Sequence, residues 1–455
     1  MVAEVKTHPG RDVVFRSAEV VGEQYQRPPG TMERLQMSPK PQELSECSAS
    51  EQVHITLGDT YESNPSILIS FASAQTLSGV HFGDTPDSLA MFYRAEATTI
   101  STVNYFDQHL YAPNLGKPDA TPEELAKELD TTSFGNSWQL FFPQGIMAVV
   151  LGMQANWTGV NNGQIVDPST YNSTSALSSL PAQQDYSNPK NVYTSPFLYS
   201  VQIDGLLKGT RYYYRVDGSC NVYSFKIPAN VYPMTVGLVA DLGITDISNA
   251  SVNALISFDP DVVLFTGDLC YADGYGEVWD TFGNMMEPLA ANVPILMTGG
   301  DHELFDAENW LPFFTRWPMP HKASGSTNMC YYGKIVGKMH VLTLCSYAGF
   351  EAGSIQHNWA ASYLRKVDRS VTPWLVVILH APWYNSNLLH YMESELMRIA
   401  FEPLLYEYSV NLVVAGHVHA YERSVPSYNF KPDTCGMVYI TIGDGGNYAG
   451  AYVPW

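Results

Sequence analysis

Side chains that bind metal ions recur at the ends of short apolar runs in the second half of this 455-residue chain. The runs are rich in Val, Leu and Ile and break at Gly or a polar residue, as fully buried strands do. Strands of such sheets end together, and the loops that follow line one crevice. The side chains delivered there are Asp241, Asp268, Tyr271, Asp301, His302, His380, His417, His419 and Asp444. With little Lys or Arg between them these groups would repel one another, so the pattern predicts a bound cation and favours two.

The residue types and their spacing indicate which metals would bind. Asp268 follows a glycine, and Tyr271 lies three residues further on, so one turn can present both a carboxylate and a phenol. A phenolate oxygen favours iron(III), whereas the imidazole of His380 suits zinc, iron or manganese. In an extended loop His417 and His419 point the same way, so both can reach a two-metal cluster. Asp268 is the carboxylate best placed to bridge the two ions.

Two metal ions a few ångströms apart are suited to phosphoryl chemistry. Such ions clamp the phosphoryl oxygens and lower the pKa of a bound water, and the resulting hydroxide attacks phosphorus in line. A protonated histidine nearby can donate to the departing alkoxide, which typically contributes about 10²–10⁴-fold.

Composition excludes several other classes of protein. A hydrophobic content of 45% with 13% aromatic residues excludes a disordered chain, and a formal charge of −21 argues against partners such as nucleic acid or an anionic membrane surface. The longest apolar stretch, Gly145–Met153, is too short to span a bilayer. The N-terminus has no apolar core of the kind that a signal peptide requires, so no signal peptide is visible.

The cysteines and glycosylation signals are only weakly informative. Six cysteines in so long a chain do not make a disulfide scaffold, and the absence of any CxxC pair excludes a zinc finger. Cys270, inside the ligand turn, is interpreted as a small buried residue. Sequons at Asn156, Asn172 and Asn249 are weak evidence of secretion and of a glycoprotein.

The chain divides into three parts by pattern. Residues 1–50 are polar and punctuated by proline, which predicts a loosely packed extension. Residues 51–230 contain short strands typical of an antiparallel β-sandwich, interrupted by a long insertion at about 97–194 that contains a helix start at Thr121. Residues 231–455 alternate buried strands with amphipathic segments, which predicts a layered domain of sheets and helices.

The ordered motifs DLG, GDLCY, GDHE, ILHAPWY and GHVHAYER resemble those of the purple acid phosphatases, which are calcineurin-like metallophosphoesterases. The segments VHITLGD and TRYYYRV look like the fibronectin type III-like domain of plant-type members. The resemblance covers about residues 50–95 and 195–455. It implies an α+β fold in which an N-terminal antiparallel β-sandwich precedes a four-layer α/β/β/α metallophosphoesterase domain.

The resemblance also implies roles for single residues. Iron(III) would be bound by Asp241, Tyr271 and His419, with Asp268 bridging. One divalent metal (zinc, manganese or iron(II)) would be bound by His380, His417 and Asp301. His302 and His390 would contact the substrate phosphate, and His390 is the better proton donor. Tyr271 to iron(III) charge transfer would give a purple colour.

Three departures from the family pattern bear on activity. Asp301 stands where the family has a neutral asparagine, which adds a negative charge and should weaken the attraction for phosphate. Leu389 stands where plant members often have a second histidine before His390. The chain also stops soon after GDGGN, where relatives usually continue, which we interpret as a fragment or a sheet without its closing edge.

The function that we predict is hydrolysis of phosphate monoesters at acid pH by a metal-activated hydroxide. The alternatives are a phosphodiesterase or nucleotide pyrophosphatase on the same scaffold, and a degenerate relative that binds phosphate without catalysis. The partners expected are small phosphate esters or phosphoproteins, with a homodimer left open, and the family is mostly secreted or vacuolar (lysosomal). Glu303 and Asp444 are expected as hydrogen-bond acceptors near the site. The histidines expected to be structural are His54, His81, His109, His321, His340 and His357.

Overall fold

The computed structural model describes residues 2–5, 14–16, 34–37, 47, 49–60, 63–95, 97–103, 183–187, 193–305 and 308–451. Most of the expected extension and insertion therefore lies outside the described residues, as do the helix expected at Thr121, the apolar stretch 145–153, His109, Asn156 and Asn172. None of the helices in the described part of the chain has the length and apolar character needed to cross a membrane.

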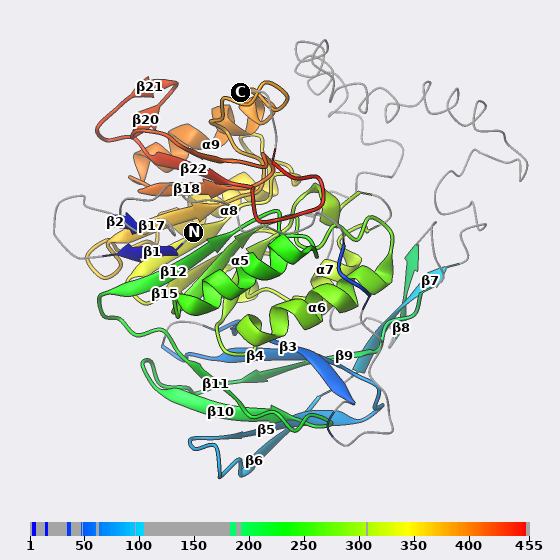
Figure 1. Ribbon diagram of the computed structural model, residues 1–455. Helices are drawn as coiled ribbons and strands as arrows, with labels where there is room; N and C mark the ends of the chain where they lie inside the picture. Colours follow the sequence, from blue (N-terminus) through cyan, green and yellow to red (C-terminus); the bar gives the residue numbers. More distant parts are fainter. Residues whose placement is uncertain are drawn as a thin grey trace, which may run out of the picture.

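Two β-sheets form the N-terminal half, at the bottom of Figure 1. The first has the order β3 (Ser50–Leu57), β4 (Ile67–Ser73), β9 (Phe197–Ile203), β7 (Ala97–Val103) and β8 (Gln183–Ser187). The second has the order β11 (Tyr223–Lys226), β10 (Arg211–Val216), β5 (Ser78–Gly83) and β6 (Met91–Ala95). All their strand pairs are antiparallel except β7 with β8. Alternate side chains of β10 are buried, as expected for a sandwich strand.

Two mixed sheets form the C-terminal half. One has the order β14 (Ile295–Thr298), β13 (Val262–Thr266), β12 (Met234–Val239), β1 (Val2–Val5) and β2 (Val14–Arg16). The other has the order β15 (Tyr332–Val336), β16 (Met339–Thr343), β17 (Trp374–Ile378), β18 (Leu412–Ala415), β22 (Val438–Ile442) and β19 (Tyr421–Arg423). The inner strands are parallel and almost wholly buried, which explains their continuous apolar runs.

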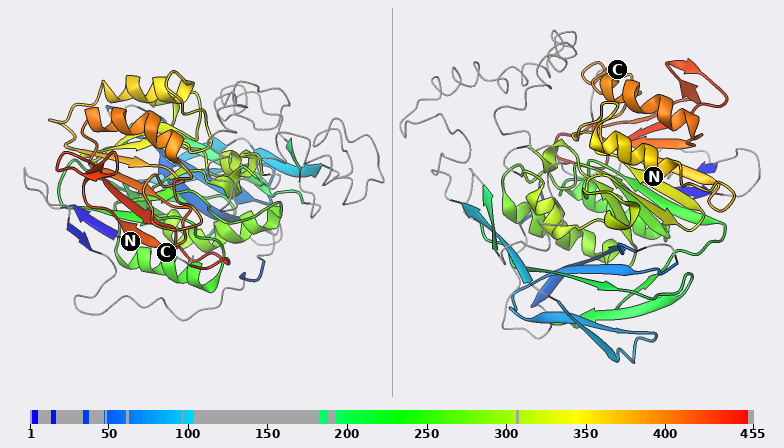
Figure 2. Two further views of the ribbon diagram at one scale, coloured as in Figure 1. Left: turned by 90° about the horizontal axis from the view of Figure 1, so that it is seen from above. Right: turned by 180° about the vertical axis from the view of Figure 1, so that it is seen from behind.

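Helices cover the outer faces of these two sheets (Figures 1 and 2). Helices α5 (Asp246–Ser257) and α6 (Gly276–Ala290) lie on one side, and α8 (Ile355–Leu364) and α9 (Glu395–Glu407) lie on the other. The structure therefore confirms the predicted fold class, with antiparallel sheets followed by a layered α/β domain of mixed sheets.

A buried polar network joins the N-terminal sheets to the layered domain. Helix α6 packs against β3, and a guanidinium nitrogen of Arg316 lies 2.9 Å from a carboxylate oxygen of Asp280 and 3.0 Å from the side-chain oxygen of Gln52. Arg316 also donates to the Tyr193 hydroxyl, which itself donates to Asp280. All four side chains are buried, so separating the two halves would leave the hydrogen bonds of Gln52 and Tyr193 to the Arg316–Asp280 pair unmade.

Two disulfides are present in the described residues, Cys47–Cys220 and Cys330–Cys345. Cys270 is free and buried, as expected, and Cys435 is free and exposed. Disulfides persist in oxidising compartments, so these two bonds are consistent with a protein of the secretory pathway.

Candidate metal centre

Each candidate ligand lies in a loop that follows a strand of one of the two mixed sheets. The pairs are β12 with Asp241, β13 with Asp268, β14 with Asp301, β17 with His380, and β18 with His417. Three of these strands belong to one sheet and two to the other, and β13 lies against β17. The candidate centre therefore forms where the carboxyl ends of two facing sheets meet.

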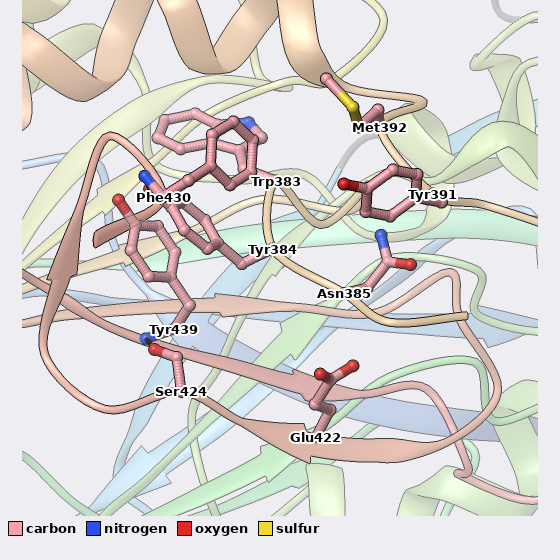
Figure 3. A pocket seen from close by; sticks show the side chains of 9 residues that line it. All are labelled: Trp383, Tyr384, Asn385, Tyr391, Met392, Glu422, Ser424, Phe430 and Tyr439. Carbon is pink, nitrogen blue, oxygen red and sulfur yellow. Dashed lines mark hydrogen bonds between the residues drawn. The ribbon is translucent and has the colours of Figure 1, made fainter. Parts of the chain in front are cut away.

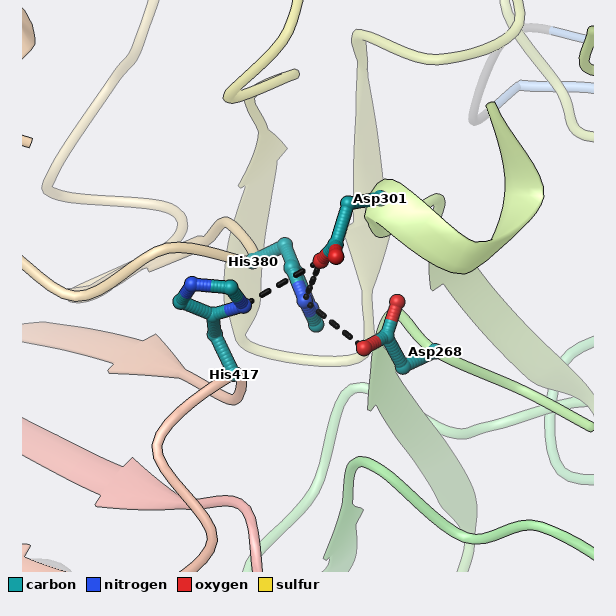
Figure 4. A group of neighbouring side chains, drawn as sticks. All are labelled: Asp268, Asp301, His380 and His417. Carbon is teal, nitrogen blue, oxygen red and sulfur yellow. Dashed lines mark hydrogen bonds and ion pairs between the residues drawn. The ribbon is translucent and has the colours of Figure 1, made fainter. Parts of the chain in front are cut away.

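Four of the predicted ligands form one cluster (Figure 4). Asp268, Asp301, His380 and His417 each offer an atom within 4.8 Å of the others. Nε2 of His380 lies 3.3 Å from the Asp268 carboxylate and 3.2 Å from that of Asp301. Nδ1 of His417 lies 3.1 Å from the same Asp301 oxygen. Two carboxylates and two imidazoles at this separation have the composition of a divalent-metal site.

A second cluster adjoins the first and contains Asp241, Tyr271 and His419. The Tyr271 hydroxyl lies 3.2 Å from an Asp241 carboxylate oxygen and 3.1 Å from Nε2 of His419. Nε2 of His419 lies 3.5 Å from the same Asp241 oxygen. The backbone N–H of His417 donates to both Asp241 oxygens, at 3.0 and 2.8 Å, and so connects the two clusters. All the predicted metal ligands therefore lie in one continuous group.

Unusual backbone geometry turns several of these side chains into the crevice. Asp241, Asp268, Tyr271 and His417 have φ values of 52°, 53°, 55° and 66°, in the left-handed region that L-residues seldom occupy. Such conformations cost energy and are characteristic of sites where function selects the orientation of a side chain.

The glycine before Asp301 makes room for the Asp268 carboxylate. A Cβ atom on Gly300 would lie 2.0 Å from an Asp268 carboxylate oxygen. Any other residue at this position would therefore displace Asp268. This close approach is a physical reason for glycine immediately before the Asp-His-Glu sequence.

Hydrogen bonds hold the donor groups in orientations suited to metal binding. Nδ1 of His380 lies 2.7 Å from the Thr266 carbonyl oxygen, and Nδ1 of His419 lies 3.0 Å from that of Gly450. In each ring the N–H is thereby directed to a carbonyl, and Nε2 is left facing the other donors. Glu303, as predicted, accepts hydrogen bonds, here from the backbone N–H groups of Asp268, Leu269 and Gly300. The residues present thus fit a pair of metal ions.

The electrostatics of the first cluster also favour cations. Burial lowers the pKa of His380, but the Asp268 and Asp301 carboxylates outweigh burial and raise this pKa well above its usual value. Burial lowers the pKa of His417 too, but Glu393 and Asp301 raise it in the same way. The cluster thus retains positive charge as protons on its imidazoles, and bound metal ions would replace those protons.

The two predicted phosphate contacts lie beside the clusters, each held by a carboxylate. Nδ1 of His302 lies 2.5 Å from Asp273, and its Nε2 lies 4.0 Å from Asp268. Burial lowers the pKa of His302, but Asp268 and Asp273 raise it to about 10. The His390 ring centre lies 4.6 Å from that of His417, and Nδ1 of His390 lies 2.6 Å from Glu393. Both rings therefore face the candidate centre.

Sequence reasoning missed several residues of this site. Glu393 contacts both His390 and His417 and belongs to a second group of candidate ligands with them. Asp273 orients His302, and Arg34 donates to the Tyr271 carbonyl at 2.8 Å and lies 3.7 Å from Asp273. The spacing HisxxGlu at 390–393 was a signal for Glu393, whereas nothing in the sequence near Arg34 pointed to the site.

One expected acceptor does not reach the candidate centre. Asp444 is exposed, whereas Asn447, three residues later, is buried. The Asn447 amide donates to the Asp241 carbonyl at 3.0 Å and lies 3.4 Å from Nε2 of His419. The glycines that separate the two residues turn the chain, so the expectation for Asp444 was wrong.

Comparisons with known proteins agree with this geometry. A family model described as calcineurin-like phosphoesterase matches residues 234–421. Purple acid phosphatase 21 of Arabidopsis thaliana is 45% identical over 263 residues, which cover 57% of this chain and 60% of the relative. A phosphoenolpyruvate phosphatase of Allium cepa is 39% identical over 284 residues, which cover 57% of this chain and 59% of the relative. The chain thus spans about three fifths of the length of the curated relatives that it matches.

A solved structure has a similar fold. The purple acid phosphatase PPD1 from seeds of yellow lupin (Lupinus luteus) gives a TM-score of 0.62 at 18% sequence identity, covering 89% of this chain and 66% of the lupin chain. At this identity the likeness concerns the fold alone.

Proposed function

We propose that this chain is a plant purple acid phosphatase and that it hydrolyses phosphate monoesters at a binuclear metal centre. The observation that carries the proposal is the continuous group of seven donor side chains at the ends of two facing sheets, with His302 and His390 beside it. Relatives named as acid phosphatases support the same reaction.

We propose distinct metals for the two clusters. Asp241, Tyr271 and His419 suit iron(III), because a phenol supplies a hard anionic oxygen. Asp301, His380 and His417 suit zinc, manganese or iron(II), and Asp268 would bridge. When bound, the two ions would neutralise phosphoryl charge and activate a water nucleophile.

The chain's own side chains would bind the phosphoryl group and move a proton. His302, whose Nδ1 lies 2.5 Å from Asp273, would donate a hydrogen bond from Nε2 to a phosphoryl oxygen. His390 would protonate the departing alkoxide, with Glu393 fixing the orientation of its ring through Nδ1. We propose that hydrolysis is faster at acid than at neutral pH, in keeping with relatives named as acid phosphatases.

We propose a secreted or vacuolar location for the protein. The two disulfides support this location, because thiols stay reduced in the cytosol. Asn249, which lies in a glycosylation sequon, is exposed on α5.

One preparation tests the activity and the metals together. The protein, loaded with iron and zinc, is expected to contain two ions per chain, to show a visible phenolate-to-iron band, and to hydrolyse phenyl phosphate faster at acid than at neutral pH. Bis(phenyl) phosphate and a nucleotide pyrophosphate are the comparison substrates. Faster hydrolysis of either would favour the diesterase or pyrophosphatase alternative. A metal-loaded protein inactive from acid to neutral pH would overturn the proposal.

The Asp301→Asn variant is expected to bind inorganic phosphate about tenfold more tightly, because it removes one unit of negative charge beside the anion. Oδ1 of Asp301 lies 3.0 Å from the Tyr347 hydroxyl, 3.1 Å from Nδ1 of His417 and 3.2 Å from Nε2 of His380. The amide oxygen of an asparagine can take the place of Oδ1 and keep these contacts. The measurement is the inhibition constant of phosphate, with metal content determined on the same sample.

The control for this variant is Asp259→Asn. Asp259 is exposed and lies outside the site, so phosphate inhibition should stay unchanged. If Asp301→Asn instead raises both metal content and rate from near zero, the native chain is a degenerate relative and the proposed activity is wrong.

A further inference from the structure

A side pocket is formed by residues that follow β17 and β18 in the chain (Figure 3). It has a volume of about 150 Å³ and is lined by Trp383, Tyr384, Asn385, Tyr391, Met392, Glu422, Ser424, Phe430 and Tyr439. An apolar cavity of about this volume accommodates one six-membered ring. None of the described residues that line it is Lys or Arg, and Glu422 contributes a carboxylate.

The walls of the side pocket continue directly from the metal centre. Tyr391 follows His390, Trp383 lies three residues after His380, and Glu422 lies three residues after His419, and three residues of chain span at most about 11 Å. The Asn385 amide donates to the carbonyl of His390 at 3.1 Å, which joins the two walls beside the proposed proton donor. The side pocket and the candidate metal centre therefore share the chain segments that follow β17 and β18.

The aromatic wall of the side pocket is held rigid from behind. The hydroxyls of Tyr384 and Tyr439 both donate to the buried carboxylate of Glu402, at 2.6 and 2.9 Å, and their rings stack at 4.1 Å. The Phe430 ring packs 5.1 Å from that of Tyr384. Because the two tyrosine hydroxyls are bonded to Glu402, this wall presents ring surface to a ligand. The rings are already fixed, so their side chains lose little conformational freedom when a ligand binds.

We propose that the side pocket binds a planar aromatic ring of the leaving group, so that the preferred substrates are phosphate monoesters of alcohols carrying an uncharged ring. This inference rests on the proposed function. The volume of the pocket and its aromatic lining favour such a group, while the Glu422 carboxylate and the absence of Lys and Arg from the lining disfavour leaving groups with further phosphates or carboxylates.

The test compares ethyl phosphate with benzyl, 2-phenylethyl and 3-phenylpropyl phosphate on the metal-loaded protein. All four release aliphatic alcohols of similar reactivity, so the ring and its tether are the main differences. The best ring-bearing ester is expected to exceed ethyl phosphate at least about tenfold in kcat/KM. Phe430→Ala should lower that ratio about fivefold or more and leave ethyl phosphate unchanged. Equal kcat/KM for all four esters would overturn the proposal.

The matched control is Phe92→Ala, because Phe92 on β6 is 53% exposed and Phe430 is 46% exposed. The Phe92→Ala variant should keep the native kcat/KM for ethyl phosphate. It should also keep the native ratio of kcat/KM for the best ring-bearing ester to kcat/KM for ethyl phosphate. Equal losses in Phe430→Ala and Phe92→Ala would mean that the pocket does not select the ring. Ethyl phosphate has no ring, so its hydrolysis reports the phosphatase activity alone. If it is hydrolysed but the ring-bearing esters show no advantage, the pocket proposal is wrong and the proposed function stands.

Direct binding tests the pocket even in an inactive preparation. Saturation-transfer NMR with benzyl alcohol should give a signal with the native protein and a weaker one with Phe430→Ala. A 4-carboxybenzyl phosphate should be a poorer substrate than benzyl phosphate, and Glu422→Gln should narrow that difference. No signal from benzyl alcohol, or no effect of Glu422→Gln, would contradict the proposal.

Discussion

The Asp268→Asn variant is expected to lose roughly 10³-fold or more in kcat, because loss of one metal ion removes several kcal/mol of transition-state stabilisation. Asp268 lies 3.3 Å from His380 and shares a cluster with Asp301 and His417. Among the seven ligands it is the one proposed to serve both ions. An asparagine offers a single neutral oxygen, so metal content should fall from two ions per chain to one or fewer.

The control for Asp268→Asn is again Asp259→Asn, because the backbone at the two positions is alike. Asp259 has φ 45° and Asp268 has φ 53°, a region that asparagine also tolerates. Without metal, both variants should unfold at temperatures close to that of the metal-free native protein. A loss of rate that occurs only in Asp268→Asn therefore reports on metal binding. Retention of two ions and the native rate by Asp268→Asn would contradict a bridging role.

The clustering of the ligands could be predicted because it depends on a simple property of sheets. Runs such as Val262–Thr266 are apolar throughout, so they had to be inner strands, and inner parallel strands end at one edge. The amphipathic segments predicted between the strands of residues 231–455 include 248–258 and 394–408, and helices α5 and α9 are present there. The short-range sequence pattern and the geometry of sheets were thus enough to predict that Asp268, His380 and His417 lie close together.

Elements without a clear pattern were missed. Helix α6 carries Gly283 and Pro288, which disfavour a helix interior, and most of its residues are buried, in part because it packs against β3. Strand β5 is short and begins and ends near glycines. The roles of Asp273 and Arg34 depend on contacts between segments far apart in the chain, which residue spacing cannot indicate.

Glu393 contacts both His390, the proposed proton donor, and His417, a proposed metal ligand, and this position predicts the effect of removing its charge. Its carboxylate lies 2.6 Å from Nδ1 of His390 and 3.2 Å from Nε2 of His417. Burial raises the pKa of Glu393, but His417 and His390 outweigh burial and lower it to about 2. Because the folded pKa lies below the ordinary value, the carboxylate stabilises the fold above about pH 4.5, and this contribution is lost only as pH falls through 2.

The Glu393→Gln variant is therefore expected to lose roughly 10–100-fold in divalent-metal affinity or in kcat, since it weakens the support of a ligand ring and of the proton donor. The loss should be nearly constant from pH 5 to 7, where the native carboxylate stays ionised. Metal titration and kcat at saturating metal separate the two effects, and Glu393→Asp should recover part of the loss. The exposed Glu407 at the end of α9 supplies the control, Glu407→Gln, which should behave as the native protein. Native metal affinity and kcat in Glu393→Gln would mean that His390 and His417 keep their orientations without it.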